Sequence, residues 1–328
     1  MGVDAIGDDP GEPEYGWDTA LPRPATGLQD FLKQLWAQGI IEEELTMMTA
    51  NNRPCAVITG GAGLLGKAMA SAFAVEGFDI LLADIDGHRL ELVAEGLRAR
   101  GIQVLTQVTD VASAAALDAL RDAALTQFGR VNRLCLNAGL AIPKPFEALT
   151  RDDWDKVLGV QFHGVLNGIL SFLPQLIAQG ESRNAVDRNR HIIIVSSMSG
   201  VGRADLRPIN APYVVAKHAT VGLTEVMAPT MERHGIGVSV LCPGMTVADP
   251  TAMQGKIWPM ASAAWYENNL LDADQVAAEM MAGIAEKRLH IFPHRLGRQE
   301  VIDRHAHLMA DFDSAERTSP PITTPAET

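Results

Sequence analysis

Residues 59–66 read Thr-Gly-Gly-Ala-Gly-Leu-Leu-Gly and directly follow the apolar run of residues 55–59. That run predicts a buried strand, and residues 67–75 beyond the glycines have the spacing of a helix. Glycines at such a junction let the backbone turn sharply and let a pyrophosphate approach without a Cβ in the way. The N–H groups and the positive dipole end of the helix then face the phosphates. We expect a dinucleotide to bind here, with a purely structural turn as the alternative. The predicted contacts are Gly60, Gly63, Leu64, Leu65 and Gly66.

Outward from the glycines, short β-branched runs alternate with helical stretches over most of the chain. This alternation is typical of βα units in a parallel sheet. Apolar strands flanked by amphipathic helices imply that helices cover both faces of the sheet. We therefore predict an α/β fold, a Rossmann-like doubly wound parallel sheet of about seven strands. The strand candidates are residues 55–59, 79–83, 103–106, 133–136, 191–195, 237–241 and, with a weaker signal, 289–292.

The two ends of the chain lack this pattern. We predict an N-terminal arm over residues 1–50 with one amphipathic helix, a Rossmann-fold domain over residues 51–310, and a disordered tail over residues 311–328. The apolar stripe of the arm helix packs on its own domain, or it covers a neighbouring subunit or the substrate entrance. The stripe consists of Leu28, Phe31, Leu32, Leu35 and Trp36.

Composition narrows the class of protein. The chain is 47% hydrophobic and 20% charged, as in ordinary globular proteins, and its formal net charge is −13. Nucleic acids and anionic membranes are polyanions that attract Lys and Arg, so neither is an expected partner. The three cysteines lie far apart, without metal-ligand spacing, and we expect no metal site. No apolar run reaches the ~18 residues needed to span a bilayer, and the acidic start lacks a signal peptide's pattern. We expect a cytoplasmic protein.

A carboxylate after the second predicted strand bears on the choice of dinucleotide. Asp84 stands about 20 residues beyond the glycines, where a carboxylate can accept both hydroxyls of the adenine ribose. Its charge would repel the 2′-phosphate of NADP. We therefore predict NAD, with Asp84 and Ile85 as contacts. Asp86 is a rival for this role, and Arg89 lies near enough to keep NADP as the alternative.

Tyr213-Val214-Val215-Ala216-Lys217 places a phenol and an ammonium four residues apart, hence on one face of a helix. A phenol with a pKa near 10 is a poor base at neutral pH, but a nearby ammonium stabilises the phenolate. Lys217 would thus make Tyr213 a usable acid/base. An exposed helix face with no chemical role is the alternative for this pair alone.

A serine-rich segment, Ser196-Ser197-Met198-Ser199-Gly200, follows the predicted strand over residues 191–195. Ligands bind at the carboxyl edge of such a sheet, so a serine there can hydrogen bond a substrate oxygen without acting as a nucleophile. A Gly-x-Ser-x-Gly nucleophile elbow is absent from the sequence. Acyl transfer is therefore the weaker interpretation.

Taken in order, these motifs resemble the short-chain dehydrogenase/reductase family, and the resemblance covers residues 53–295. Several independent motifs in the family's order make coincidence a poor explanation. The later motifs resemble its single-domain branch. The motifs are Thr-Gly-x-x-Gly-x-x-Gly from Thr59, Asp84, Asp110-Val111, Asn137-Ala138-Gly139, Ser197, Tyr213-x-x-x-Lys217 and Pro243-Gly244.

The resemblance implies a role for each matched residue. Tyr213 would exchange a proton with the substrate oxygen while a hydride passes to or from the nicotinamide. Lys217 would hold the nicotinamide ribose and tune Tyr213, and Ser197 would orient the substrate carbonyl or alcohol. The remaining implied cofactor contacts are Asp110 and Val111 at the adenine, Asn137, Ala138 and Gly139 along the cleft, and Pro243, Gly244 and Thr246 beside the nicotinamide.

The sequence departs from the family pattern at a few positions. Leu64 stands where the single-domain branch usually has glycine. Gln161 stands where the family often has an asparagine in a water-mediated proton relay, and it either still relays protons or displaces the water and slows turnover. Ser197 and Tyr213 are 16 residues apart, a longer interval than usual. The added loop, with Arg203, Asp205 and Arg207, borders the substrate pocket or is simply a solvated surface loop.

These observations predict an NAD-dependent oxidoreductase that interconverts a secondary alcohol and a ketone, with a bulky aromatic or alicyclic substrate. The alternatives are an NADP-dependent carbonyl reductase and a catalytically weak NAD-binding scaffold or sensor. By the resemblance we also expect a homodimer or homotetramer. An apolar lid over the substrate is a further hypothesis, with core packing as its alternative; its residues are Trp258, Met260, Trp265 and Tyr266.

Overall fold

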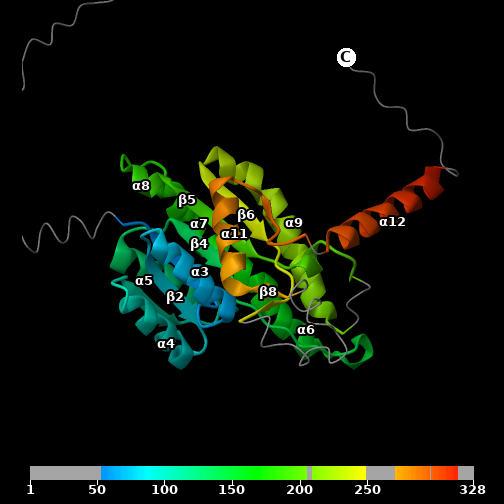
Figure 1. The fold of residues 1–328 in the computed structure, drawn as a ribbon, viewed down its shortest axis with the longest axis horizontal. Helices are drawn as coiled ribbons and strands as arrows, with labels where there is room; N and C mark the ends of the chain where they lie inside the picture. Colours follow the sequence, from blue (N-terminus) through cyan, green and yellow to red (C-terminus); the bar gives the residue numbers. More distant parts are fainter. Residues whose placement is uncertain (1–52, 205–208, 249–269, 296, 317–328) are drawn as a thin grey trace, which may run out of the picture. The chain divides into compact units, whose positions relative to one another are not determined.

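The chain divides into two compact units, Met1–Ala50 and Asn51–Thr328. The computed structural model describes residues 53–204, 209–248, 270–295 and 297–316, all of which belong to the second unit (Figure 1). The predicted arm helix lies outside the described residues, and so does the predicted lid.

One parallel sheet organises the second unit, and the predicted fold is confirmed. Its strands follow the order β3-β2-β1-β4-β5-β6-β9, so the chain starts in the middle and winds outward in both directions. The strands are β1 Cys55–Thr59, β2 Asp79–Asp84, β3 Val104–Val108, β4 Arg133–Leu136, β5 Arg190–Val195, β6 Ile236–Leu241 and β9 His290–Ile291.

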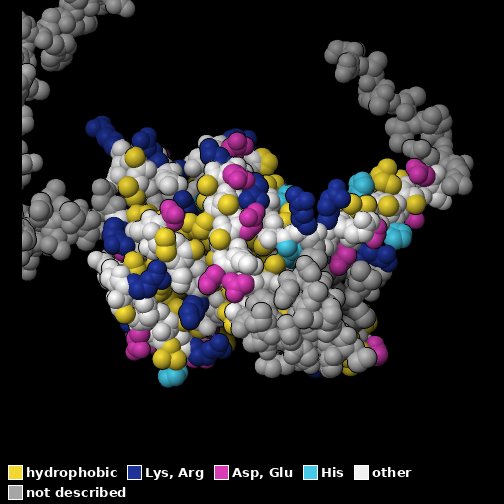
Figure 2. All heavy atoms as spheres, viewed as in Figure 1, with side chains coloured by type: hydrophobic (Ala, Val, Ile, Leu, Met, Phe, Trp, Pro, Cys, Tyr) yellow, Lys and Arg dark blue, Asp and Glu magenta, His cyan; other side chains and the backbone are white. Residues whose placement is uncertain are grey.

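Helices cover both faces of this sheet, because strands with buried side chains on both sides need two apolar covers. One hydrophobic cluster joins the sheet to α3, α4 and α11, and a second joins it to α5, α7 and α9. Figure 1 shows α3, α4 and α11 together on the face turned to the viewer. On that face basic and acidic side chains are interspersed (Figure 2). The helices are α3 Leu64–Val75, α4 Gly87–Arg98, α5 Ala114–Phe128, α7 Gly164–Gln179, α9 Ala211–Arg233 and α11 Ala273–Ala285.

Some elements differ from their predicted bounds. Strand β3 runs to Val108, two residues further than predicted, because Asp84 of β2 pairs with Val108 and prolongs the ladder. The sequence patterns also missed a two-stranded parallel sheet of β7 Thr246–Val247 and β8 Leu271–Asp272, which is too short to show a period. The short helices are η1 Phe146–Ala148, α6 Arg151–Leu158, η2 Gly159–His163, α8 Ala185–Arg188 and η3 Met198–Gly200.

Helices α6, η2 and α7 form one continuous helix, Arg151–Gln179, with a π-turn at Gly159–His163. By length and composition this helix could span a membrane. The sequence did not indicate this, because the apolar residues of the helix are interrupted by polar ones. Its apolar residues Val165, Ile169, Phe172 and Leu176 lie in the core against the sheet. The helix is therefore a core element of the fold, where a high apolar content is expected.

The last helix, α12 Arg298–Glu316, corrects one predicted boundary. The disordered tail was expected to begin at Asp311, but the helix continues to Glu316. The segment around Asp311 is polar, and a helix with so little apolar periodicity is hard to recognise from sequence. One contact to the rest of the unit is the 3.4 Å hydrogen bond from Arg304 Nη1 to the Val201 carbonyl.

Candidate active site

The carboxyl end of β5 and the first turns of α9 bring three predicted residues to one edge of the sheet. Ser197 follows the last residues of β5, and Tyr213 and Lys217 lie one turn apart on α9. Lys217 Nζ donates to the carbonyl of Val195 at 2.7 Å, and it lies 5.4 Å from the centroid of the Tyr213 ring. The helix therefore presents the phenol and the amine at the end of the strand that carries the serine.

Lys217 is 4% exposed, and burial has a direct electrostatic consequence. Because an ammonium loses its hydration in the interior, desolvation lowers the pKa of Lys217 to about 7. Cys242 opposes this shift slightly. Lys217 therefore loses its proton far more readily than an exposed lysine does.

Two residues that the sequence patterns missed fix the start of α9 against β5. Ser196 Oγ donates to the carbonyl of Lys217 at 2.9 Å, and Thr220 Oγ1 approaches the same carbonyl at 2.9 Å. Both hydroxyls are buried. Gly200 packs directly on this carbonyl, where a Cβ would come within 2.6 Å of it. The helix of Tyr213 and Lys217 is therefore fixed through the backbone carbonyl of Lys217. The roles of Ser196 and Thr220 become visible only in the tertiary structure.

Ser197 keeps much of its hydrogen-bonding capacity. Its Oγ accepts from Ser199 N at 3.1 Å, which caps the short helix η3. The hydroxyl proton has only a 3.5 Å contact with the Pro243 carbonyl, at the limit of a hydrogen bond. Ser197 can therefore donate this proton to a substrate oxygen.

The glycine turn leaves room for a phosphate group. Gly60 has φ +67, a conformation that favours glycine, and a Cβ on Gly66 would collide with the Gly60 carbonyl. Gly63 precedes α3 as N-cap and makes no side-chain capping bond, and the first turn of α3 contains no acidic residue. Side chains cap α4, α5, α6 and α11 instead. The free N–H groups of α3 thus fit an anionic ligand.

Thr59, at the end of β1, ties the glycine turn to the segment after β4. Its Oγ1 accepts from Asn137 N at 3.0 Å and from Ala138 N at 3.2 Å. In return, Asn137 Nδ2 donates to the carbonyls of Thr59 and Gly60. The Asn-Ala-Gly segment therefore fixes the turn, and the side-chain NH₂ of Asn137 is used for hydrogen bonds to the backbone. Thr59 was predicted as the last residue of the strand and the first of the glycine motif, without a role of its own.

Asp84 and Asp86 have different roles in the structure. Asp84 Oδ2 accepts from Ala62 N at 3.1 Å in the glycine turn, and Oδ1 accepts from Asp86 N at 3.1 Å. Asp86 accepts from Arg89 N and caps α4. Since each carboxylate oxygen has a further lone pair, Asp84 can still bind a ribose hydroxyl. Its position beside the turn fits this role better than that of Asp86.

The predicted adenine contacts separate into exposed and buried residues. The Ile85 side chain is 73% exposed next to Asp84, which fits an apolar support for an adenine ring. Asp110 is exposed and accepts from Ala112 N at 2.9 Å. Val111, by contrast, is 7% exposed and packs against Gly164 of α7. The side chain of Val111 therefore packs in the core, and its carbonyl accepts from Asn167 Nδ2 at 3.1 Å.

Gln161 lies in the π-turn, which packs against α9. It is 2% exposed, and its Nε2 donates to the carbonyl of Leu140 at 2.8 Å. Its buried Oε1 has no hydrogen-bond partner among the described residues. Gly139 faces this amide: a Cβ there would lie 3.2 Å from Gln161 Nε2. An unmet buried acceptor is costly, so this oxygen marks a place for a water or a ligand.

The segment after β6 packs against His294, a residue that no sequence pattern indicated. Pro243 is buried, and its carbonyl accepts from Met198 N. Thr246 Oγ1 donates to the carbonyl of Gly244 at 3.2 Å. His294 lies so close to Gly244 that a Cβ there would collide with its ring. His294 follows β9 in the chain, so the contact depends on the order of strands in the sheet.

Parts of the predicted site lie outside the described residues. These include Asp205 and Arg207 of the long loop and the four residues of the predicted lid. Within the described part of the chain, no group of three or more His, Cys, Asp or Glu side chains could hold a metal ion.

Comparison with known proteins gives a consistent result. The family model described as short chain dehydrogenase matches residues 54–261. A relative named C alpha-dehydrogenase, from a Sphingobium species, is 29% identical over 81% of this chain and 88% of its own. The 1-deoxy-11-beta-hydroxypentalenate dehydrogenase of Streptomyces exfoliatus is 28% identical over 76% of this chain and 86% of its own. A solved short chain dehydrogenase/reductase from Burkholderia phymatum, in complex with NAD, superposes with a TM-score of 0.67 at 30% identity. It covers 83% of this chain and 99% of that one.

Proposed function

The chain belongs to the short-chain dehydrogenase family, and from this premise we propose that it interconverts a secondary alcohol and a ketone with NAD. As a member it is an NAD(P)-dependent oxidoreductase that acts on CH–OH groups. The observation that carries the finer proposal is the meeting of Ser197, Tyr213 and Lys217 at the sheet edge that also holds the uncapped start of α3.

Each of the three residues has one task in this proposal. Ser197 Oγ donates a hydrogen bond to the substrate oxygen and orients it. During oxidation Tyr213, as phenolate, accepts the hydroxyl proton, and during reduction the phenol returns it to the carbonyl. The ammonium form of Lys217, next to the Tyr213 ring, favours the phenolate. When bound, NAD supplies the acceptor for the hydride that leaves the carbinol carbon.

The proton needs a path, and Gln161 is our candidate for it. Its Oε1 is an unmet acceptor on a turn that packs against α9, the helix of Tyr213 and Lys217. A water bound to Oε1 would connect the site to the carbonyl of Leu140 and onward to solvent. Gln161 then acts as a positioning residue for that water.

NAD is favoured over NADP by the place of Asp84. The carboxylate anchors the glycine turn through Ala62 N, and its charge would repel a 2′-phosphate on the adenine ribose. The Burkholderia phymatum neighbour, solved with NAD, supports the same choice. Arg89 has an exposed side chain on α4 and is the residue an NADP-dependent enzyme would use.

A bulky apolar substrate fits the rim of the site. Three large apolar side chains near this edge are exposed: Leu140 after β4, Met245 after β6 and Ile209 before α9. Their exposed fractions are 37%, 44% and 54%. Exposed apolar groups around a polar centre are typical of a pocket for an apolar ligand. The relative named for hydroxypentalenate is consistent with this substrate class.

We also propose a cytoplasmic location and a homo-oligomeric assembly. All three cysteines are free and buried, which fits a reducing cytoplasm. A homodimer or homotetramer is what the family resemblance implies.

A substrate panel tests the proposal. The wild type is mixed with NAD and a series of aromatic and alicyclic secondary alcohols, and NADH is followed by stopped-flow absorbance. We expect turnover on at least one alcohol and none above background with Tyr213→Phe. Binding of NAD without turnover on any alcohol would instead make the protein a cofactor-binding scaffold. A preference of the wild type for NADPH would establish the reductase alternative.

A further inference from the structure

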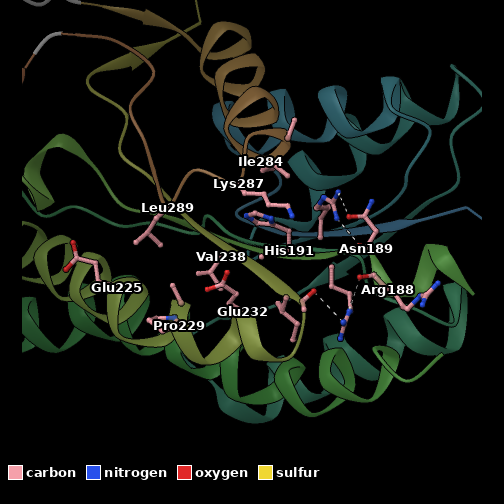
Figure 3. A pocket seen from close by; sticks show the side chains of 17 residues that line it. Arg188, Asn189, His191, Glu225, Pro229, Glu232, Val238, Ile284, Lys287 and Leu289 are labelled. Carbon is pink, nitrogen blue, oxygen red and sulfur yellow. Dashed lines mark hydrogen bonds between the residues drawn. The ribbon is translucent and has the colours of Figure 1, made fainter. Parts of the chain in front are cut away.

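A cavity lies at the amino edge of the sheet, opposite the edge that carries Ser197. It has a volume of about 770 Å³ and is formed where β5 and β6 begin, between the end of α9 and the end of α11 (Figure 3). The strands are parallel, so their amino ends point away from the dinucleotide site. The mechanism proposed above does not use this cavity.

Two buried arginines belong to the wall of the cavity. Arg133 and Arg190 are 7% and 5% exposed. Arg133 donates to the carbonyls of Asn132 and Asn189 and to the Asn189 side chain, while its Nε has no hydrogen-bond partner among the described residues. Arg190 donates only to backbone carbonyls, including those of Leu176 and His234. Within the described chain, neither guanidinium is paired with a carboxylate.

Glycines make room for these groups. A Cβ on Gly180 would lie 2.6 Å from Arg190 Nη1, and a Cβ on Gly237 would collide with the His191 ring. His191 is neutral, since burial lowers its pKa to about 3. Ser239 Oγ donates to the Arg288 carbonyl at 2.6 Å, so it accepts from His191 Nε2 at 2.8 Å. The other ring nitrogen of His191 carries no proton.

Lys287 adds an unusual backbone feature at the rim. Its φ of 56° is the one positive value at a non-glycine residue in the described ranges. Glycine is the usual residue at this position after a helix, so lysine here carries a conformational cost. In Figure 3, Lys287 and His191 lie in the middle of the cavity, with Arg188 toward one end and Glu225 at the other.

The charges around the cavity do not cancel. Among the described residues, four cationic side chains and two carboxylates line it, in a protein whose overall net charge is −13. One of the two, Glu225, already binds His290 at 2.9 Å. The other, Glu232, is exposed. The cationic residues are Arg133, Arg188, Arg190 and Lys287.

We propose that this cavity binds a small multivalent anion with phosphate or carboxylate groups, at a site separate from the dinucleotide. Among the described residues the buried guanidinium groups have no carboxylate as counter-charge, and a charge without one is costly in the interior. An anion in the cavity supplies it through charge-assisted hydrogen bonds from Lys287 and Arg188 at the rim. Because such a ligand binds only the folded protein, it also stabilises the fold.

The test is a titration with pyrophosphate and, separately, citrate. The full chain is first saturated with its dinucleotide, so that the phosphate site at α3 is filled. Binding is followed by calorimetry and by the melting temperature, with sodium chloride at equal ionic strength as reference. The variants are Lys287→Gly and Arg188→Gln. Arg183→Gln is the matched control, because Arg183 is an exposed arginine of the same segment that does not line the cavity.

We expect saturable binding to the wild type and to Arg183→Gln. Loss of one charge-assisted contact weakens binding about tenfold, so Arg188→Gln and Lys287→Gly should each do so. Lys287→Gly should also melt no lower than the wild type without anion, because glycine suits this backbone position. This behaviour separates lost binding from lost folding.

Two results would overturn the proposal. One is a wild type that responds to pyrophosphate and citrate no more than to sodium chloride. The other is a Lys287→Gly protein that binds either anion as tightly as the wild type. Neither readout uses turnover, so a failure here leaves the proposed dehydrogenase activity untouched, and the reverse also holds.

Discussion

At the carboxyl edge of the sheet, α3 begins without a capping side chain and Gln161 keeps an unmet acceptor. At the amino edge, by contrast, the side chains of Asn132 and Arg190 make hydrogen bonds to backbone groups. The two edges thus leave different groups for a ligand: hydrogen-bonding groups of the α3 backbone and of Gln161 at the carboxyl edge, and buried positive charge at the amino edge. Unmet donors and acceptors cost stability, so they are found where a ligand or water supplies the partner.

The largest expected effect is at the carboxyl edge. Tyr213→Phe removes the hydroxyl that we propose as the acid/base, and positioned acid/base catalysis contributes typically ~10²–10⁴-fold. We expect kcat to fall by about this factor, while NADH still binds, because Phe keeps the ring that packs near Lys217. Steady-state kinetics and a fluorescence titration of NADH measure the two quantities. A variant that keeps a tenth of the activity would contradict the role of Tyr213.

The next effect belongs to the amino edge. Arg190→Met leaves the carbonyls of Leu176 and His234 without their buried donor, which should lower the free energy of unfolding by about 3 kcal/mol. Urea denaturation measures this change. Arg183→Met, at an exposed arginine nearby, is the control and should change it little. Activity per folded molecule should be normal in both, and a large loss in the folded Arg190 variant would show that the edges are coupled.

A smaller effect tests cofactor choice. Asp84→Asn removes the charge that opposes a 2′-phosphate but keeps an oxygen that can accept from Ala62 N. We expect the ratio of kcat/KM for NAD over NADP to fall about tenfold, the size of one charged contact. Asp86→Asn is the matched variant, since Asn can still cap α4. If Asp86→Asn shifts the ratio more, the ribose carboxylate is Asp86.

The smallest effect is a pH dependence of stability. Burial lowers the pKa of Lys217 to about 7 from 10.5 in the unfolded chain, so between these values the unfolded state binds more protons. The free energy of unfolding should therefore rise with pH through this window, by roughly 1 kcal/mol between pH 7 and pH 8. Lys217→Met has no proton to lose and should lack this rise. Parallel urea titrations of the cofactor-free proteins decide the point; equal slopes would mean that Lys217 stays charged.

The sites at the two edges differ in how far sequence reasoning reaches. The glycine turn, Asp84 and the Tyr213–Lys217 pair were predicted, because each lies next to a strand or on one helix face and local spacing reveals it. The hydrogen bonds of Thr59 and Thr220 were missed, since Thr59 accepts from backbone N–H groups distant in the chain and Thr220 meets the hydroxyl of the distant Ser196. The contact of His294 with Gly244 was missed for the same reason.

The amino-edge cavity was beyond sequence reasoning altogether. Arg133 was predicted only as the start of a strand and Arg190 received no role, because nothing in the chain order places two guanidinium groups in one cavity. The positive φ of Lys287 also leaves no sequence signal, since lysine is an ordinary residue near a helix end.

The sequence by itself determined the alternation of strands and helices, the place of the glycine turn and the common helix face of Tyr213 and Lys217. Those features depend on residues close together in the chain, where hydrophobic period and glycine spacing act directly. Only the tertiary structure decided that Val111 is buried, that Gln161 keeps a free acceptor, and that the amino edge gathers uncompensated positive charge. These properties depend on burial and on contacts between distant segments, which exist only once the sheet has brought its strands together.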